Sequence, residues 1–314
     1  MASSEIGSDA GGPLFADATS RTAGRSLRRS QRRRAGGHTS SVRRPADTSG
    51  TMKNISMTLG FVGTGAIASA IVTGLVSEGG TRLTIRLSPR NAAVAAGLAS
   101  RFDNVSVCAS SQEVLDGSET IVLAVRPQVA EEVLSGLRFS SGQIVISLVA
   151  GFSTRRIGGL VTPAGKIWRA IPLPSVAQRR SPIALYPPGG PPAELFSLLG
   201  RVFGIEKEDH LNALSTATST MAAYFGFAGH IASWVARKGI AEQQCREYVA
   251  LMFAGLADAG LDASQRRFED LATAHATPGG LNEQVLRDLT DHGVFDTLTE
   301  ALDSVHRRAA GASA

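Results

Sequence analysis

"LGFVGTGAIASAIVTGL", residues 59–75, decides the fold of this chain: a short apolar run leads into the pattern G-x-G-x-x-A at residues 63–68, and a helical pattern follows at once. Where a strand turns into a helix in this way, the first glycine permits a tight turn, the second lets a pyrophosphate approach the backbone, and the small third residue lets helix and strand pack closely. The unpaired amide groups at the start of the helix then face the phosphates. The predicted cofactor contacts of this turn are Gly63, Gly65, Ala66, Ile67 and Ala68. The alternative interpretation is a tight turn with a structural role alone.

Outward from this turn, strand-like and helical patterns alternate. Apolar strand-like runs lie at 58–62, 82–87, 104–108, 119–125, 143–149, 165–171 and 182–186. Helical patterns lie near 66–79, 91–101, 111–116, 127–136 and 153–160. This alternation predicts an α/β fold of the Rossmann type, a doubly wound parallel sheet with helices on both faces.

The segment "YPPGGPP", residues 186–192, cannot continue a helix or a central strand, so it predicts a domain boundary. Helical patterns follow it at about 193–203, 208–238, 241–259, 263–275, 279–291 and 293–308. The pattern over 208–238 is mostly apolar or small, which suggests burial against a second subunit. The expected domains are a disordered basic tail (1–56), an NADP-binding Rossmann domain (57–187) and an all-α substrate and dimerisation domain (188–314).

The net charge of +5 resides in the tail, because residues 1–56 carry ten basic and four acidic residues and the remaining chain carries −1. The folded part is therefore not expected to bind nucleic acid. The tail is rich in Ser, Gly, Ala and Arg and too poor in large apolar residues to fold alone. Three interpretations stay open: an organelle transit peptide, a segment that binds anionic surfaces, or translated upstream sequence with the true start at Met52 or Met57.

The spacing of the cysteines and the length of the apolar runs indicate the cellular compartment. Cys108 and Cys245 show no metal-ligand or C-x-x-C spacing, so no metal site is expected and a reduced, intracellular compartment fits. No apolar run reaches the roughly 18–20 residues that a membrane span needs. We expect a cytoplasmic location, with organelle targeting by the tail as the alternative.

The end of the second strand predicts the choice of coenzyme. NAD sites usually place an acidic residue there for the ribose hydroxyls, but "IRLSPRN", residues 85–91, contains none. Ser88 and Arg90, with help from Asn91, are expected to hold a 2′-phosphate, since a guanidinium pairs well with phosphate oxygens. NADPH is therefore predicted rather than NADH, the alternative being a solvated turn with an incidental arginine.

The fourth strand ends in "VLAVRPQ", residues 122–128, with a proline at the first turn of the next helix. Ligands of doubly wound sheets bind at the carboxyl ends of the strands. Val125 and Pro127 are therefore predicted to lie beside the nicotinamide ribose.

Several segments together resemble the pyrroline-5-carboxylate reductase family, whose members catalyse the last step of proline synthesis. They are "GFVGTGAIASAIVTGL", "LAVRPQ" for the family's V-K-P-Q, "SLVAG" (147–151) for S-x-x-A-G, "RAIPLP" (169–174) for R-x-M-P-N-x-P, "AAY" (222–224) for the end of S-G-S-G-P-A-Y, and "TPGG" (277–280) for S-P-G-G. Their order and spacing fit over residues 57–308. The resemblance implies a Rossmann domain, a helical dimerisation domain and NADPH-dependent reduction of a cyclic imino acid.

The chain departs from the family pattern where the resemblance places the substrate. Leu173 stands for the family's Asn, residues 218–222 stand for S-G-S-G-P, and Leu281 and Asn282 stand for two threonines that grip the substrate carboxylate. The departures put the identity of the substrate in question rather than the fold.

A "TPGG" turn at a helix start supplies amide groups that suit a carboxylate. Thr277 is expected to cap that helix, with Glu283 favourable in its first turn. The predicted catalytic-site contacts are Thr220, Thr277, Gly279 and Gly280. The alternatives are a plain helix cap and a structural mid-helix threonine. His275 is expected to bond locally at a helix end rather than to protonate an imine.

These patterns favour an NADPH-dependent reductase that converts 1-pyrroline-5-carboxylate to L-proline. One alternative keeps the family but changes the imino acid, and another is a non-catalytic NADPH-binding sensor. The expected partners are a small-molecule imino acid and further copies of the chain, as a homodimer or a larger homo-oligomer, without nucleic acid or membrane.

Overall fold

The computed structural model describes residues 56–77, 82–263 and 266–309. The chain divides into two units, Met1–Asp47 and Thr48–Ala314, and all described residues belong to the second. The predicted disorder of the tail falls outside them.

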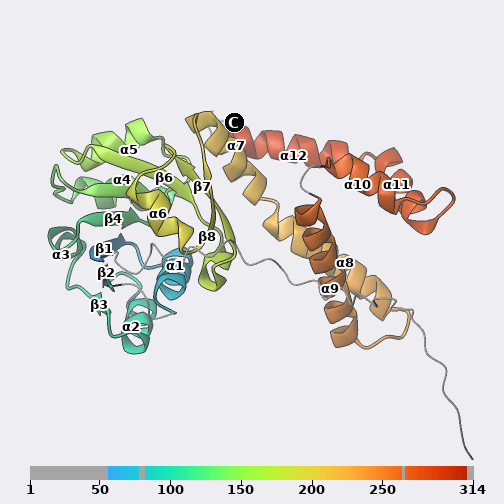
Figure 1. Ribbon diagram of the computed structural model, residues 1–314, viewed down its shortest axis with the longest axis horizontal. Coiled ribbons are helices and arrows are strands. Elements are labelled where there is room, and N and C mark those ends of the chain that lie inside the picture. Colours follow the sequence, from blue (N-terminus) through green and yellow to red (C-terminus); the bar gives the residue numbers. More distant parts are fainter. Residues whose placement is uncertain (1–55, 78–81, 264–265, 310–314) are drawn as a thin grey trace, which may run out of the picture. The chain divides into compact units, whose positions relative to one another are not determined.

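The core of this unit is one eight-stranded sheet (Figure 1). Its strands are β1 (Ser56–Val62), β2 (Arg82–Leu87), β3 (Val105–Val107), β4 (Thr120–Leu123), β5 (Ile144–Ser147), β6 (Lys166–Ile171), β7 (Ser181–Tyr186) and β8 (Gly200–Gly204). They lie in the order β3-β2-β1-β4-β5-β6-β7-β8, and β1 to β6 are parallel to one another. Since the order reverses between β1 and β4, the predicted doubly wound fold is confirmed.

Helices follow the strands as the alternation predicts. In the sheet part they are α1 (Ala66–Val76), α2 (Ala92–Arg101), α3 (Ser111–Asp116), α4 (Pro127–Ser135), α5 (Thr154–Val161), the 3₁₀ helix η1 (Pro174–Gln178) and α6 (Pro191–Ser197). Two buried apolar clusters pack them onto the strands: α1, α2 and α6 contribute to one, and α3, α4 and α5 to the other. Burial on both faces explains why β4 is uniformly apolar apart from its first residue.

The last two strands add features that the sequence analysis did not predict, and one of its assignments is wrong. In the mostly parallel sheet, β7 runs antiparallel to β6. The helical pattern over 193–203 is helical only in its first part, and β8 then pairs in parallel with β7. Strand β8 was missed because only three residues stand between its terminal glycines and it forms a half-exposed sheet edge. Gly200 has φ +147°, and a Cβ there would overlap the carbonyl oxygen of Ser181 on β7.

The rest of the chain is helical, as predicted. Its helices are α7 (Glu208–Thr218), α8 (Met221–Ala236), α9 (Glu242–Asp262), α10 (Phe268–His275), α11 (Leu281–Asp291) and α12 (Val294–Ala309), coloured gold to red in Figure 1. Within this part α8 packs on α9, and α12 packs on α7.

The single helix predicted over 208–238 is two helices. Thr218, Ser219 and Thr220 each donate a side-chain hydrogen bond to the carbonyl three residues earlier, on Ser215, Thr216 and Ala217. These hydroxyls satisfy carbonyls that have no partner at the end of a helix, so α7 stops and α8 starts anew.

Helix α8 is the most apolar of these helices, yet none of its residues is buried in the single chain. Phe225 is 71% exposed, and Tyr224, Phe227 and Trp234 are also exposed. Among the described helices, none combines the length and the apolar character that crossing a bilayer requires.

Candidate functional site: the glycine turn and the helix starts around it

The glycine turn joins β1 to α1 and has the geometry that the sequence predicts. Gly63 has φ +96°, and a Cβ there would lie 2.7 Å from the carbonyl oxygen of Ala124, so no other residue fits. Ala68 is fully buried, which lets α1 pack closely. Gly65 precedes α1 as its N-cap residue, without a side-chain cap. A Cβ on Gly65 would meet no described atom within 4 Å.

The space beside Gly65 and the uncapped start of α1 together form a cradle for an anion. Ala66 is exposed and Ile67 half-buried, so the first amides of α1 lie at the surface. Such amides bind phosphate well because they have no partner within the helix. The residues of this turn therefore fit a dinucleotide pyrophosphate.

Strand β4 brings its end next to the turn. The amide of Ala124 donates to the carbonyl of Val62 at 2.8 Å, and a Cβ on Gly63 would also touch the backbone nitrogen of Val125. Pro127 is the first residue of α4. Val125 thus lies beside the glycine turn, at the point where the strand order reverses.

Ser88 is placed differently from the prediction. It is only 1% exposed, and its Oγ accepts a hydrogen bond from the amide of Gly63 at 2.9 Å. Thr64 Oγ1 donates to the Ser88 carbonyl at 3.0 Å, and Asn91 Nδ2 donates to the Thr64 carbonyl at 3.2 Å. These bonds tie the turn to the end of β2, so Ser88 positions the turn and does not lie open to a ligand.

Arg90 stays a candidate for the 2′-phosphate. It is exposed on the loop between Ser88 and the start of α2. Among the described residues, the guanidinium of Arg90 forms no hydrogen bond and no ion pair.

The "TPGG" turn precedes α11, but its amides are already bonded. The N-cap residue is Gly280, not Thr277 as predicted. The amide of Gly279 donates to Glu283 Oε2 at 2.7 Å, and that of Gly280 donates to the Thr277 carbonyl at 2.8 Å. The expectation that both glycine amides are exposed donors is therefore wrong for the single chain, because the chain supplies its own acceptors.

The other predicted residues of the helical part make local contacts. Thr220 is half-buried and uses its hydroxyl hydrogen on the Ala217 carbonyl. His275 Nδ1 lies 2.8 Å from the Leu271 carbonyl, which confirms the local role. Within the described part of the chain, no hydrogen bond joins Thr220 or the "TPGG" turn to the residues around the glycine turn, so the predicted site forms two separate groups.

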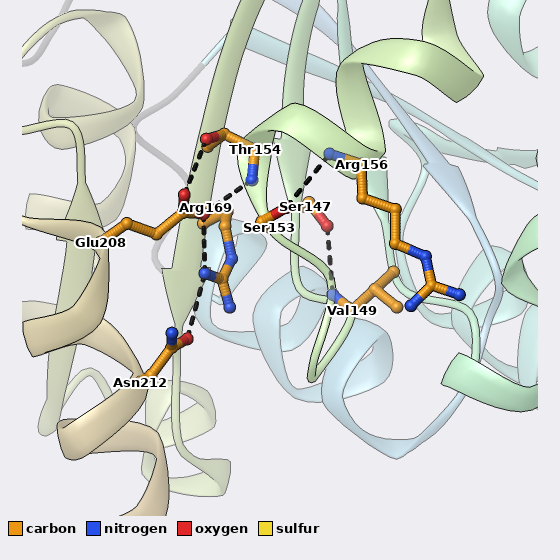
Figure 2. A network of polar contacts seen from close by, with 8 residues as sticks. All are labelled: Ser147, Val149, Ser153, Thr154, Arg156, Arg169, Glu208 and Asn212. Carbon is orange, nitrogen blue, oxygen red and sulfur yellow. Dashed lines mark hydrogen bonds and ion pairs between the residues drawn. The ribbon is translucent and has the colours of Figure 1, made fainter. Parts of the chain in front are cut away.

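A third group, which the sequence analysis missed, surrounds the carboxylate of Glu208 (Figure 2). Glu208 is the first residue of α7, and its Oε1 accepts from the amide of Thr154 at 2.6 Å and from Arg169 Nη1 at 2.8 Å. Its Oε2 accepts from Thr154 Oγ1 at 3.0 Å. Arg169 Nη1 also donates to Asn212 Oδ1 at 3.2 Å.

Burial by itself raises the pKa of Glu208, but the hydrogen bonds from Thr154 and Arg169 outweigh burial and hold the pKa below its ordinary value. The signal in the sequence was a lone arginine inside an apolar strand, "KIWRAI", because a buried arginine needs a carboxylate partner.

Comparisons with known proteins divide the chain in the same way. Residues 58–151 match the domain family described as NADP oxidoreductase coenzyme F420-dependent, and residues 208–312 match pyrroline-5-carboxylate reductase dimerisation. Pyrroline-5-carboxylate reductase from Haemophilus influenzae is 25% identical over 259 residues, which cover 78% of this chain and 94% of that protein. Pyrroline-5-carboxylate reductase 3 from Xenopus laevis is 24% identical over 269 residues, 81% of this chain and 96% of that protein.

Solved structures agree over nearly their whole length. The 1-pyrroline-5-carboxylate reductase of Streptococcus pyogenes superposes with a TM-score of 0.72 at 26% identity, covering 82% of this chain and 99% of that one. The Plasmodium falciparum pyrroline carboxylate reductase with NADP bound has a TM-score of 0.70 at 18% identity, covering 83% of this chain and 100% of that one, and it supports the fold.

Proposed function

We propose that this chain is a reductase of the pyrroline-5-carboxylate reductase family, to which its matches point. Its reaction is the NADPH-dependent reduction of 1-pyrroline-5-carboxylate to L-proline. The observation that carries the proposal is the open, uncapped glycine turn at the switch point of the sheet, in a chain whose helical part matches the family's dimerisation domain.

Three parts of the sheet hold the coenzyme in this proposal. The amides of residues 65–67 bind the pyrophosphate, Arg90 binds the 2′-phosphate, and the β4 end at Val125 and Pro127 borders the nicotinamide ribose. When bound, NADPH supplies the hydride. Ser88 keeps the turn in place through the amide of Gly63.

The helical part presents the substrate. A cyclic imine that arrives protonated needs no strong acid from the protein, so the protein's task is to orient the ring and to hold its carboxylate. We assign the carboxylate to the start of α11, where Thr277 is exposed, and a further contact to Thr220. Gly279 and Gly280 shape this turn, and the Gly279 amide is bonded to Glu283.

A different imino acid is the second candidate substrate within the same reaction class. Leu281, which is 82% exposed, and Asn282 stand where the family has threonines, and Asn282 Nδ2 donates to the His275 carbonyl. An apolar side chain and an engaged amide offer a carboxylate fewer donors than two hydroxyls do.

The helical part also supports assembly into a homo-oligomer, which we propose is a homodimer or a larger homo-oligomer. A cavity of about 590 Å³ is open between α8, α9 and α10, with Tyr224, Phe253 and Phe268 in its apolar lining. Together with the exposed face of α8, this surface suits the same helices of a second copy.

Two further proposals concern the chain's organisation. We place the division between its two parts after Gly204 rather than at residue 187, because β8 pairs with β7. We place the protein in the cytoplasm, while the tail that suggests organelle targeting lies outside the described residues.

The proposed reaction is tested by following NADPH oxidation with 1-pyrroline-5-carboxylate, 1-pyrroline-2-carboxylate and piperideine carboxylates. Turnover of the first compound supports the leading proposal, and turnover of only the others supports the second candidate. Tight NADPH binding without any turnover contradicts both and supports a non-catalytic sensor.

The coenzyme site is tested by replacing Arg90 with Ala. Loss of the guanidinium should raise the KM for NADPH by about tenfold or more, because a charge-assisted hydrogen bond contributes about 1.5–3 kcal/mol, and should leave the KM for NADH nearly unchanged. Arg101→Ala, on the far end of α2, serves as the control. Equal effects on the KM values of both coenzymes would show that Arg90 does not bind the 2′-phosphate.

A further inference from the structure

The Glu208 carboxylate joins two segments of the sheet part to the first helix of the helical part. Thr154 begins α5, Arg169 lies on β6, and Glu208 itself begins α7 (Figure 2). The start of α5 and one guanidinium therefore face a single carboxylate, which interacts favourably with both.

The Thr154 side of this network leads to the coenzyme edge. Residues 148–153 form the loop from β5 to α5, and Thr154 follows directly. Strand β5 lies next to β4 on the β4–β6 half of the sheet, which in a doubly wound fold serves the second mononucleotide, here the nicotinamide half. Hydrogen bonds hold this loop at both ends. At the β5 end, the Leu148 amide donates to the Leu123 carbonyl and the Val149 amide donates to Ser147 Oγ. At the α5 end, Ser153 Oγ accepts from the Arg156 amide and the Thr154 amide donates to Glu208.

The α7 side of the network leads into the helical part. Asn212, one turn after Glu208, accepts from Arg169, and its carbonyl accepts from Thr216 Oγ1 at 3.0 Å. The Thr216 hydroxyl also lies 3.0 Å from His306 Nδ1 on α12. The end of α12 in turn approaches the loop, since a Cβ on Gly151 would lie 3.7 Å from the Ala309 carbonyl.

Burial makes this carboxylate hard to replace. The side chain of Arg169 is 6% exposed and that of Glu208 is 21% exposed. Removing the charge of Glu208 leaves the buried guanidinium of Arg169 with neutral acceptors only, Asn212 Oδ1 among them, and without the opposite charge that compensates its burial.

We propose that Glu208 is a positioning residue: its carboxylate fixes the start of α5, and with it the 148–153 loop on the nicotinamide side of the coenzyme, to the first turn of α7. The inference rests on the proposed coenzyme site and goes beyond it, because Glu208 is not among the residues assigned to the coenzyme. It couples the placement of the substrate-presenting helices to the loop beside the reacting ring.

The test compares the dissociation constants of NADPH and of 2′,5′-ADP, which lacks the nicotinamide half. In Glu208→Gln we expect about a tenfold rise in the dissociation constant of NADPH, the effect of losing one good hydrogen bond, while that of 2′,5′-ADP stays within about twofold. Glu131→Gln is the matched control, since Glu131 also binds α5, through Arg156 at 2.7 Å, but is exposed. Glu208→Asp, which keeps the charge, should recover part of the NADPH affinity.

Thr154→Val is a second variant in case Glu208→Gln fails to fold, because it leaves the Arg169–Glu208 pair intact. It should also raise the dissociation constant of NADPH, but by a smaller factor. Equal shifts for NADPH and 2′,5′-ADP, or no shift for either in a folded variant, would overturn the inference and leave the proposed function standing. Absence of binding of both ligands to the unaltered protein would overturn the proposed coenzyme site itself.

Discussion

At the scale of single residues, Gly63 and Gly65 are required for different reasons. Gly63 is required by the fold, because its φ is positive and Ala124 leaves no room for a Cβ. Gly65 is free of both constraints, since its φ is −95° and the space beside it is open. The need for a glycine at position 65 therefore arises only when a ligand approaches.

Replacing each glycine with alanine should separate the two reasons. Gly65→Ala should leave the thermal unfolding midpoint within about 2 °C of the parent and should weaken NADPH binding more than about tenfold, because the methyl group occupies the phosphate cradle. Gly63→Ala should lower the free energy of unfolding by about 3 kcal/mol or more, from strain at positive φ together with the overlap with the backbone of Ala124. Thermal melts and NADPH titration measure both effects. A Gly65→Ala protein with full coenzyme affinity would rule out phosphate binding at this turn.

The lowered pKa of Glu208 makes its contribution to stability depend on pH. A carboxyl group whose pKa is lower in the folded state contributes stability above its unfolded pKa and loses it as the pH falls through the folded pKa. At pH 7 we expect Glu208→Gln to lower the free energy of unfolding by about 2 kcal/mol, and this difference should shrink as the pH falls below about 4. Urea unfolding of both proteins at several pH values measures it. The same difference at pH 7 and pH 3 would contradict the assigned role of the charge.

At the scale of elements, β8 depends on a backbone shape that only glycine allows. Gly200→Ala introduces both positive-φ strain and an overlap with the Ser181 carbonyl, so we expect a loss of about 3 kcal/mol or more. Gly159→Ala in α5 is the control, because a Cβ there meets no described atom within 4 Å, and it should be neutral or stabilising by up to about 1 kcal/mol. Chemical denaturation compares the two. A small effect at Gly200 would show that the sheet edge tolerates rearrangement.

The sequence predicts most elements because their signals are local. The turn at 63–68 and the Pro at the start of α4 each occur within a few residues, and the apolar run of β4 reflects burial on both faces. The break between α7 and α8 was missed because it depends on which carbonyls Thr218 to Thr220 reach. The direction of β7 was missed because no local residue pattern indicates whether a strand runs parallel or antiparallel to its neighbour.

The geometry of the candidate site could be predicted from sequence only where one segment builds it. Gly63 and Gly65 do so, and their geometry follows the motif. Ser88 was assigned to the ligand because its bond to Gly63 spans 25 residues and has no local signature. The bond from Gly279 to Glu283 spans only four residues, but the sequence analysis assigned Glu283 to the helix dipole rather than to this amide, so the amide was expected to be available.

At the scale of the whole molecule, the exposed apolar surface of the helical part predicts assembly. Phe225 on α8, together with Tyr248 and Leu251 on α9, is more than two-thirds exposed in the single chain. Surfaces of this kind on a soluble chain usually mark an interface.

We therefore expect a dimer or a larger homo-oligomer at micromolar concentration, measured by light scattering. Phe225→Asp should shift the protein toward the monomer, because a charge in an apolar interface costs several kcal/mol. Val107→Asp, at the exposed position of β3, is the control and should leave the assembly unchanged. A monomeric parent protein would contradict the prediction.

The bond between Ser88 and Gly63 has a consequence for protein engineering. One way to retarget coenzyme preference is to exchange the loop after the second strand as one block. Here such an exchange would remove the hydroxyl that anchors the pyrophosphate loop, so a graft designed for NADH would lose affinity for both coenzymes. Redesign should keep the serine and vary the solvent-facing arginine two positions later.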